Sequence, residues 1–280
     1  MKIDFFCPRW GCEDLSWKVF FNKVKEAGYD GVEIGFSSDL RDDEKKEIVD
    51  GLAQYKLKCI GQHWQTTDHD FKLHQSNFAR ELYSLSMLNP LFINSQTGKD
   101  HFTEEQNIVL IDLADKIGEE TGVKIVHETH RGKWSFAAHV TERFLKKYPS
   151  VRITLDISHW CNVAESFLAD QRSAVIRAIL HTDHIHARVG YPEGPQVPDP
   201  REPLWDEALQ HHLKWWDEVV STKRDQGSSY FTITPEFGAP PYTVLLPGTN
   251  KAIANQWDIN LFMKDMLKDR YRLFAIADRS

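Results

Sequence analysis

Short apolar runs alternate with longer amphipathic stretches along the whole chain. Eight of the runs are rich in β-branched or aromatic residues and are bounded by turn residues, as buried strands are. They predict strands at residues 2–8, 29–35, 57–64, 90–98, 123–129, 151–158, 184–190 and 230–238. The stretches between them predict helices at about residues 14–27, 42–54, 71–87, 104–121, 137–148, 166–177 and 211–223, with a last helix from about residue 258.

This alternation predicts an α/β protein with a single (β/α)8 TIM barrel over residues 1–280. A doubly wound open sheet is the alternative, and it would place a glycine-rich turn after the first strand. Residues 7–12 read CPRWGC there and lack the G-x-G-x-x-G pattern. No linker or composition shift divides the chain. The longest irregular segment is the Pro-rich stretch 191–205, which we interpret as a surface loop, a lid or a subunit contact.

Composition narrows the class of protein. Hydrophobic residues make up 41% and charged residues 27% of the 280 residues, which is typical of a soluble globular protein. The net charge of −7 argues against obligate nucleic-acid binding, although a local basic groove is compatible with it. The chain begins without the apolar run of a signal peptide, and no stretch approaches the ~20 apolar residues of a membrane span. The four cysteines form no C-x-x-C pair, so we expect reduced thiols and a cytoplasmic protein.

Four of the later strands end in a side chain that can bind a metal ion. These residues are Glu128, Asp156, His186 and Glu236. In a barrel the carboxyl ends of all the strands meet at one mouth, so the four would point into one pocket. Two Glu, one Asp and one His make an oxygen-rich site for one divalent ion, and Mn²⁺, Mg²⁺, Co²⁺ or Zn²⁺ are compatible with it. A single strand-end carboxylate would more often begin a solvated loop, so the repetition is what favours a metal site.

Other polar residues near these strand ends are candidates for substrate binding. His184 and His186 share one face of a strand, and we prefer His186 as the ligand because it lies nearer the mouth. His159 follows Asp156 by three residues and could bind a substrate hydroxyl, with a core histidine as the alternative. The remaining substrate-binding candidates are Arg131, Arg188, His63 and Trp64. Solvated surface is the default expectation for Arg188, and core or rim packing is the commoner position of a strand-end Trp such as Trp64.

The predicted tetrad suits one kind of chemistry. A divalent cation polarises a carbonyl and its neighbouring hydroxyl, acidifies the adjacent C–H bond and stabilises an enediolate. Glu128 and Glu236 would be the catalytic pair, one removing a proton from carbon and the other returning it. Each would bind the metal through one oxygen and keep the other free.

At these residues the chain resembles the xylose isomerase-like TIM-barrel superfamily of sugar isomerases and epimerases. The resemblance covers essentially the whole chain and is clearest in DGVEIG, HETHRG, LDISHW, HIHARVG and TPEFG. Similarity to the ketose 3-epimerases implies a metal held by Glu128, Asp156, His186 and Glu236, the two glutamates as acid–base pair, and His159 as a substrate-binding residue. The epimerase pattern has an Arg six residues after the metal-binding His, where this chain has Pro192, so Arg188 or Arg131 would have to replace it.

The resemblance predicts a metal-dependent isomerase or epimerase acting on a sugar or sugar derivative. An inosose-type dehydratase would use the same base and metal to expel water. Two further alternatives are an apurinic-site endonuclease, which needs a three-zinc cluster, and a barrel that only binds carbohydrate. We expect a small sugar as partner, without nucleic acid or membrane, and no phosphate-binding Gly-rich loop follows the last two strands. Residues 191–205 or 211–223 are candidates for contacts in a homo-oligomer.

Overall fold

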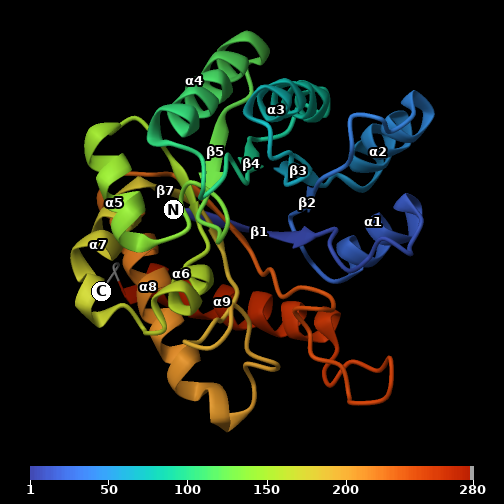
Figure 1. The fold of residues 1–280 in the computed structure, drawn as a ribbon. Helices are drawn as coiled ribbons and strands as arrows, with labels where there is room; N and C mark the ends of the chain where they lie inside the picture. Colours follow the sequence, from blue (N-terminus) through green and yellow to red (C-terminus); the bar gives the residue numbers. More distant parts are fainter. Residues whose placement is uncertain (278–280) are drawn as a thin grey trace.

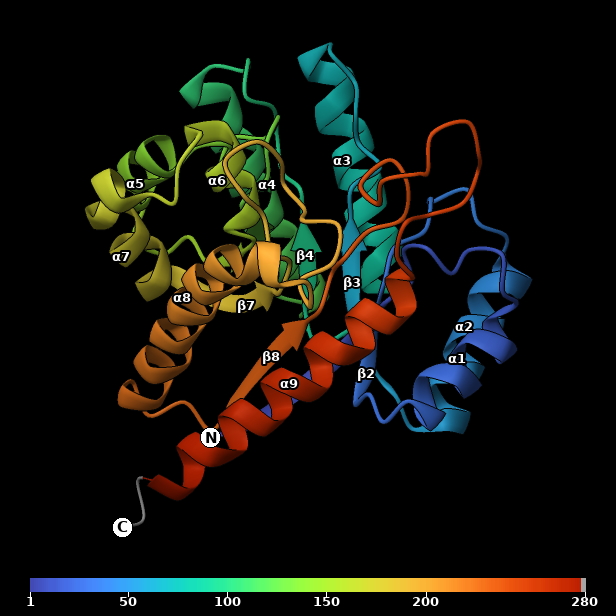
Figure 2. The ribbon, with the colours of Figure 1, turned by 90° about the horizontal axis from the view of Figure 1, so that it is seen from below.

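The computed structural model describes residues 1–277, with side chains described through residue 272. Its eight parallel strands form a closed barrel in sequence order, with the helices outside, which confirms the predicted (β/α)8 TIM barrel (Figures 1 and 2). The strands are β1 (Lys2–Pro8), β2 (Gly31–Ile34), β3 (Lys58–His63), β4 (Ile93–Ser95), β5 (Ile125–Glu128), β6 (Ile153–Leu155), β7 (Thr182–His186) and β8 (Tyr230–Thr234). Every neighbouring pair is parallel, so the carboxyl ends of the strands meet at one mouth.

The helices follow the strands in the expected order. They are α1 (Trp17–Glu26), α2 (Asp42–Tyr55), α3 (Phe71–Ser86), α4 (Glu104–Thr121), α5 (Ala138–Lys147), α6 (Ser158–Ala164), α7 (Arg172–His181), α8 (Asp206–Asp225) and α9 (Gln256–Ala277). Helix α4 begins with a capping box that the T-x-x-Q pattern of residues 103–106 specifies, with Thr103 accepting from the backbone of Gln106 and the Gln106 side chain accepting from the backbone of Thr103. Gly122 ends α4 in the left-handed conformation, at a φ of 72°. Helix α9 packs against β1, the strand that pairs with β8 and closes the barrel.

One helix prediction is wrong. Residues 166–177 do not form one continuous helix. The short α6 begins at Ser158, soon after β6, and α7 begins only at Arg172. Glu165 and Leu168 between them have positive φ values of 48° and 59°, which a continuous helix does not allow. Seven residues are too few for α6 to show helical periodicity, and most of its first turn is buried. The eighth helix also begins at Asp206, before the predicted residue 211.

The Pro-rich segment 191–205 packs against the mouth of the barrel. Val197 is fully buried, and its amide donates to the carbonyl of Val189 at 2.8 Å. The side-chain oxygen of Gln196 accepts from the amide of Gly238 at 2.7 Å, so the segment joins the loops that follow β7 and β8. None of the helices in the described part of the chain combines the length and hydrophobicity that crossing a membrane would require.

Candidate metal centre and active site

A cavity of about 370 Å³ opens at the carboxyl ends of the strands. Its size lies in the range of small-molecule sites. The lining side chains combine aromatic surface with amides, carboxylates and cations, a mixture suited to a hydroxylated ligand. They are Arg9, Trp10, Glu13, Gln62, Trp64, Gln96, Glu128, His130, Arg188, Glu236 and Tyr242, together with Gly35.

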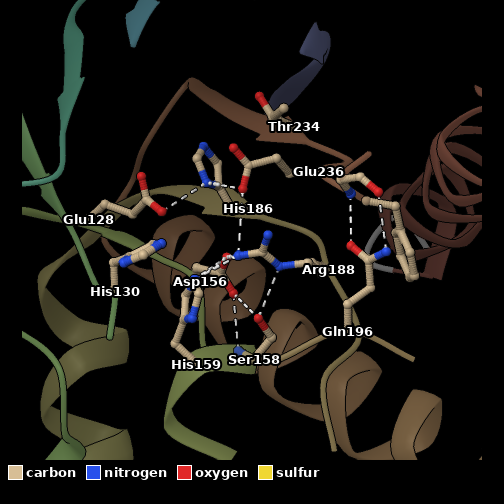
Figure 3. A network of polar contacts seen from close by, with 12 residues as sticks. Glu128, His130, Asp156, Ser158, His159, His186, Arg188, Gln196, Thr234 and Glu236 are labelled. Atoms are coloured by element: carbon tan, nitrogen blue, oxygen red, sulfur yellow. Dashed lines mark hydrogen bonds and ion pairs between the residues drawn. The ribbon is translucent and has the colours of Figure 1, made fainter. Parts of the chain in front are cut away.

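The four predicted metal ligands converge beside this cavity, and two of them, Glu128 and Glu236, line it. One ligand atom each from Glu128, Asp156, His186 and Glu236 lies within 4.8 Å of the others, and all four residues are buried (Figure 3). Nδ1 of His186 lies 2.9 Å from Oε2 of Glu236 and 3.7 Å from Oε1 of Glu128. Three carboxylates around one imidazole nitrogen make a donor set that a divalent cation prefers.

Local structure places each ligand at its strand end. Glu128 and His186 are the last residues of β5 and β7, and Asp156 directly follows β6. Thr129 ties the fifth and sixth strand ends together, because its hydroxyl accepts from the amide of Asp156 at 2.8 Å. The carboxylate of Asp156 in turn accepts from the amide of Ser158 at 3.1 Å, at the start of α6.

The ring of His186 is oriented for metal binding. Its Nε2 lies 2.9 Å from Oε1 of the buried Glu33, whereas its Nδ1 is buried and makes no hydrogen bond. Burial would lower the pKa of His186, but the Glu236, Glu33 and Glu128 carboxylates outweigh it and hold this pKa well above its ordinary value. Burial likewise would raise the pKa of Glu33, but His186 and His184 hold it well below the usual range. A buried imidazole nitrogen that faces carboxylates and lacks a hydrogen-bond partner fits a divalent metal ion.

Amide side chains hold the two glutamates. Nε2 of Gln62 donates to Oε1 of Glu236 at 2.7 Å, and Nδ2 of Asn94 donates to Oε2 of Glu128 at 3.1 Å. Gln96 makes a longer bond, at 3.4 Å, to Oε1 of Glu128. One oxygen of Glu236 is therefore held by an amide while the other faces Nδ1 of His186.

Arg188 is part of the same buried network and is only 1% exposed. Its guanidinium pairs with Asp156 and lies 3.8 Å from Oε2 of Glu236 (Figure 3). Burial raises the pKa of Asp156 to about 6 even though Arg188 opposes the shift. Arg188 also donates to Nε2 of His159 at 2.7 Å. Since an arginine only donates, the proton of a neutral His159 sits on Nδ1, which is buried and has no partner.

Solved structures show the fold to which this site belongs. No protein-family model matches the chain, and no curated protein matches it. A D-allulose 3-epimerase from Methylomonas sp. is similar with 17% identity and a TM-score of 0.62, over 96% of this chain and 98% of that one. A probable 3-DHS dehydratase, AsbF, from Bacillus anthracis has 15% identity and a TM-score of 0.57, over 95% and 99%.

A third similar structure is a xylose isomerase-like TIM barrel protein from Mycobacterium smegmatis in complex with magnesium. It has 11% identity and a TM-score of 0.57, over 85% of this chain and 92% of that one. The chain has the xylose isomerase-like TIM-barrel fold. At these identities the likeness establishes the fold, and the activity has to be argued from the site.

The predicted substrate-binding residues fall into two groups in this xylose isomerase-like barrel. Arg188 and Trp64 line the cavity, and Trp64 is 53% exposed at its rim. His159 contacts Arg188 behind the cavity wall, and the guanidinium of Arg131 lies 4.9 Å from the ring centre of Tyr242. The expected solvated position of Arg188 is wrong, because the residue is buried.

His63 is not among the residues that line the cavity. Its ring nitrogens lie 2.7 Å from Oγ1 of Thr66 and 3.0 Å from Oγ of Ser95, and its ring contacts Phe78 of α3. The reason is strand geometry, because successive side chains point to opposite faces and the preceding Gln62 points into the barrel. A substrate contact for His63 would need a different strand register.

Sequence reasoning missed the amides that hold the glutamates. Gln62, Asn94 and Gln96 belong to no recognisable motif. The prediction considered the residues at the strand ends and passed over the residues one position before them. Alternation along the strands was an available signal. On β3 and β4 the inward residues are Gln62 and Asn94, each one position before the polar residue that ends the strand.

Proposed function

We propose that this protein is a divalent-metal-dependent enzyme that isomerises or epimerises a sugar or sugar derivative. The observation that carries the proposal is the convergence of four donor atoms within 4.8 Å, with Nδ1 of His186 lacking a hydrogen bond. Glu128, Asp156, His186 and Glu236 would hold one metal ion. When bound, that ion supplies polarisation of a carbonyl and the adjacent hydroxyl.

The protein's own groups would move the protons. Glu128 and Glu236 both reach the cavity and would act as the acid–base pair, one accepting a proton from a substrate carbon and the other returning one. Amides on both glutamates fix the direction of each carboxylate. Arg188 stands beside Glu236, where its charge would stabilise negative charge on a substrate oxygen.

The cavity walls support a hydroxylated substrate. Trp10, Trp64 and Tyr242 offer aromatic surface, while Gln62 and Gln96 have amide groups at the same cavity. His159 lies behind the cavity wall and accepts from Arg188 at 2.7 Å, so it would orient a residue that lines the cavity. These features favour a small polyhydroxylated molecule.

A dehydratase is the second candidate. The similarity to a probable 3-DHS dehydratase over 95% of this chain favours it, and the same base could remove the proton before water leaves. The endonuclease alternative has weaker support, since the strand-end His63 turns towards α3 and away from the cavity.

The first test is the metal content per chain of wild type and Asp156→Ala. About one divalent ion in wild type, lost in the variant, is the expected result. Ketoses incubated with Mn²⁺-loaded enzyme should then give isomers, and a dehydrated product would select the lyase. If wild type takes up no metal after incubation with Mn²⁺ and Zn²⁺, the proposed function is wrong.

A further inference from the structure

A buried carboxylate that the proposed reaction does not use lies beneath the metal-binding residues. Glu33 is the last but one residue of β2, lies on the inward face of the barrel and is completely buried. The interior layers of such barrels are usually filled by branched aliphatic side chains. A buried carboxylate is costly unless other groups compensate it, so its position at this depth calls for a specific role.

Four polar side chains surround the two oxygens of Glu33. Oε1 lies 2.9 Å from Nε2 of His186 and accepts from Nδ2 of Asn94 at 3.1 Å. Oε2 accepts from the hydroxyl of Thr234 at 2.5 Å and lies 3.3 Å from Nε2 of His184. A carboxylate has about four acceptor positions, and here each one faces a nitrogen or a hydroxyl. Glu33, His184 and His186 also lie close enough together to hold an ion, but the bonds from Thr234 and Asn94 and the contact with His186 favour a supporting role for Glu33.

The contacts of Glu33 instead reach two of the four predicted ligands. As an acceptor, Glu33 keeps a proton of His186 on Nε2, so Nδ1, which faces the metal-binding carboxylates, is the nitrogen that would bind a metal ion. The amide of Asn94 donates to Glu33 and also to Oε2 of Glu128 at 3.1 Å. One hydrogen-bonded group therefore links the imidazole ligand from β7 to the carboxylate ligand from β5.

We propose that Glu33, together with Asn94, is the positioning residue of the metal centre. Glu33 fixes the tautomer and orientation of His186 and strengthens Nδ1 as a ligand, and Asn94 aligns Glu128 with it. The inference rests on the proposed metal site.

The substitution Glu33→Gln tests the role of the charge. The amide oxygen of glutamine can still accept from His186 and Asn94. Its NH₂ group can donate to Oγ1 of Thr234 and to Nε2 of His184, since the other nitrogen of His184 lies 3.0 Å from the carbonyl of Thr232. The variant should therefore fold with its hydrogen bonds complete and lose only the negative charge.

Mn²⁺ affinity, measured by calorimetry or by electron paramagnetic resonance, is the main readout. We expect Glu33→Gln to bind Mn²⁺ about 10- to 100-fold more weakly than wild type. Glu81→Gln is the matched control, because Glu81 is also a buried carboxylate but bonds to Ser38 beside α3. Its Mn²⁺ affinity should equal that of wild type.

Nuclear magnetic resonance of the ¹⁵N-histidine-labelled, Mg²⁺-loaded protein gives a second readout that does not depend on activity. The Nε2–H proton of His186 should resonate far downfield in wild type and move upfield in Glu33→Gln. If Glu33→Gln does not fold, Asn94→Ala decides the question, with an expected loss of about tenfold in Mn²⁺ affinity.

The outcomes separate the two proposals. If wild type binds Mn²⁺ and the folded variants bind it within threefold as tightly, with an unmoved Nε2–H resonance, the positioning role is overturned and the metal site stands. If wild type binds no Mn²⁺, the proposed function and the role of Glu33 are both overturned.

Discussion

Replacing Asp156 by Asn should destabilise the protein, because the buried guanidinium of Arg188 loses its counter-charge. Asp156 is fully buried and pairs with Arg188, which is 1% exposed. Removing one partner of a buried ion pair typically costs about 3–5 kcal/mol in the free energy of unfolding. Glu236 lies 3.8 Å from the same guanidinium and supplies part of the lost counter-charge, so we expect a loss near 3 kcal/mol, the low end of that range.

Urea denaturation of the metal-free proteins measures this loss. With a slope of about 3 kcal/mol per molar urea for a chain of this size, the midpoint should fall by about 1 M. Asp199→Asn is the matched control, because Asp199 pairs with Arg201 through side chains that are 15% and 39% exposed. That surface pair should contribute only about 0–1 kcal/mol.

A double variant separates the orphaned charge from other effects of the substitution. Adding Arg188→Met to Asp156→Asn removes the unpaired guanidinium, so the double variant should recover part of the lost stability. A midpoint for Asp156→Asn within error of wild type, or a double variant less stable than the single one, would refute the reasoning.

Three further outcomes are expected. Glu236→Gln should lower turnover about 10²- to 10⁴-fold while metal content per chain stays at the wild-type value, as an acid–base residue requires. Trp64→Ala should raise KM without moving the urea midpoint, since Trp64 is 53% exposed at the cavity rim. Burial would raise the pKa of Asp183, but hydrogen bonds from Arg152 and two lysines hold it well below the usual range. Its stabilisation is therefore present above about pH 4, the unfolded pKa, and is lost as pH falls towards the folded pKa. Urea midpoints at pH 7 and pH 3 should show a smaller acid-induced drop for Asp183→Asn than for wild type.

The order of strands and helices could be predicted because each element has its own hydrophobic period. Strand β1 was predicted at its observed residues, and the cap at Thr103 and the stop at Gly122 bounded α4 correctly. The failure at α6 has a physical cause. Seven residues make fewer than two helical turns, so the segment shows no amphipathic stripe, and Ser158 was assigned to the end of the sixth strand.

The metal ligands could be predicted because four apolar runs each end in a side chain that can bind a metal ion. One such residue would carry little information, but four at equivalent strand ends indicate a common site. The residues that hold the ligands could not be predicted in the same way. Gln62 and Asn94 are neutral, and their importance depends on which face of the strand points inward and on contacts between strands far apart in the chain. The prediction of His63 as a cavity residue ignored that alternation. A step of one residue along a strand reverses the direction of the side chain.

The two halves of the barrel contribute different groups to the site. Strands β5 to β8 and the residues directly after them provide the carboxylates and the imidazole that converge within 4.8 Å. Strands β2 to β4 provide Glu33, Gln62 and Asn94, each of which hydrogen-bonds at least one of those groups. Since a ligand set alone is compatible with several reactions, the direction in which each carboxylate points decides where a proton can be taken and returned. Substitution of Gln62, which bonds to Glu236 alone among the ligands, should therefore alter rate and product ratio at constant metal content. Substitutions of Glu33 and Asn94 should in addition weaken Mn²⁺ binding, and Asp156→Ala should abolish it.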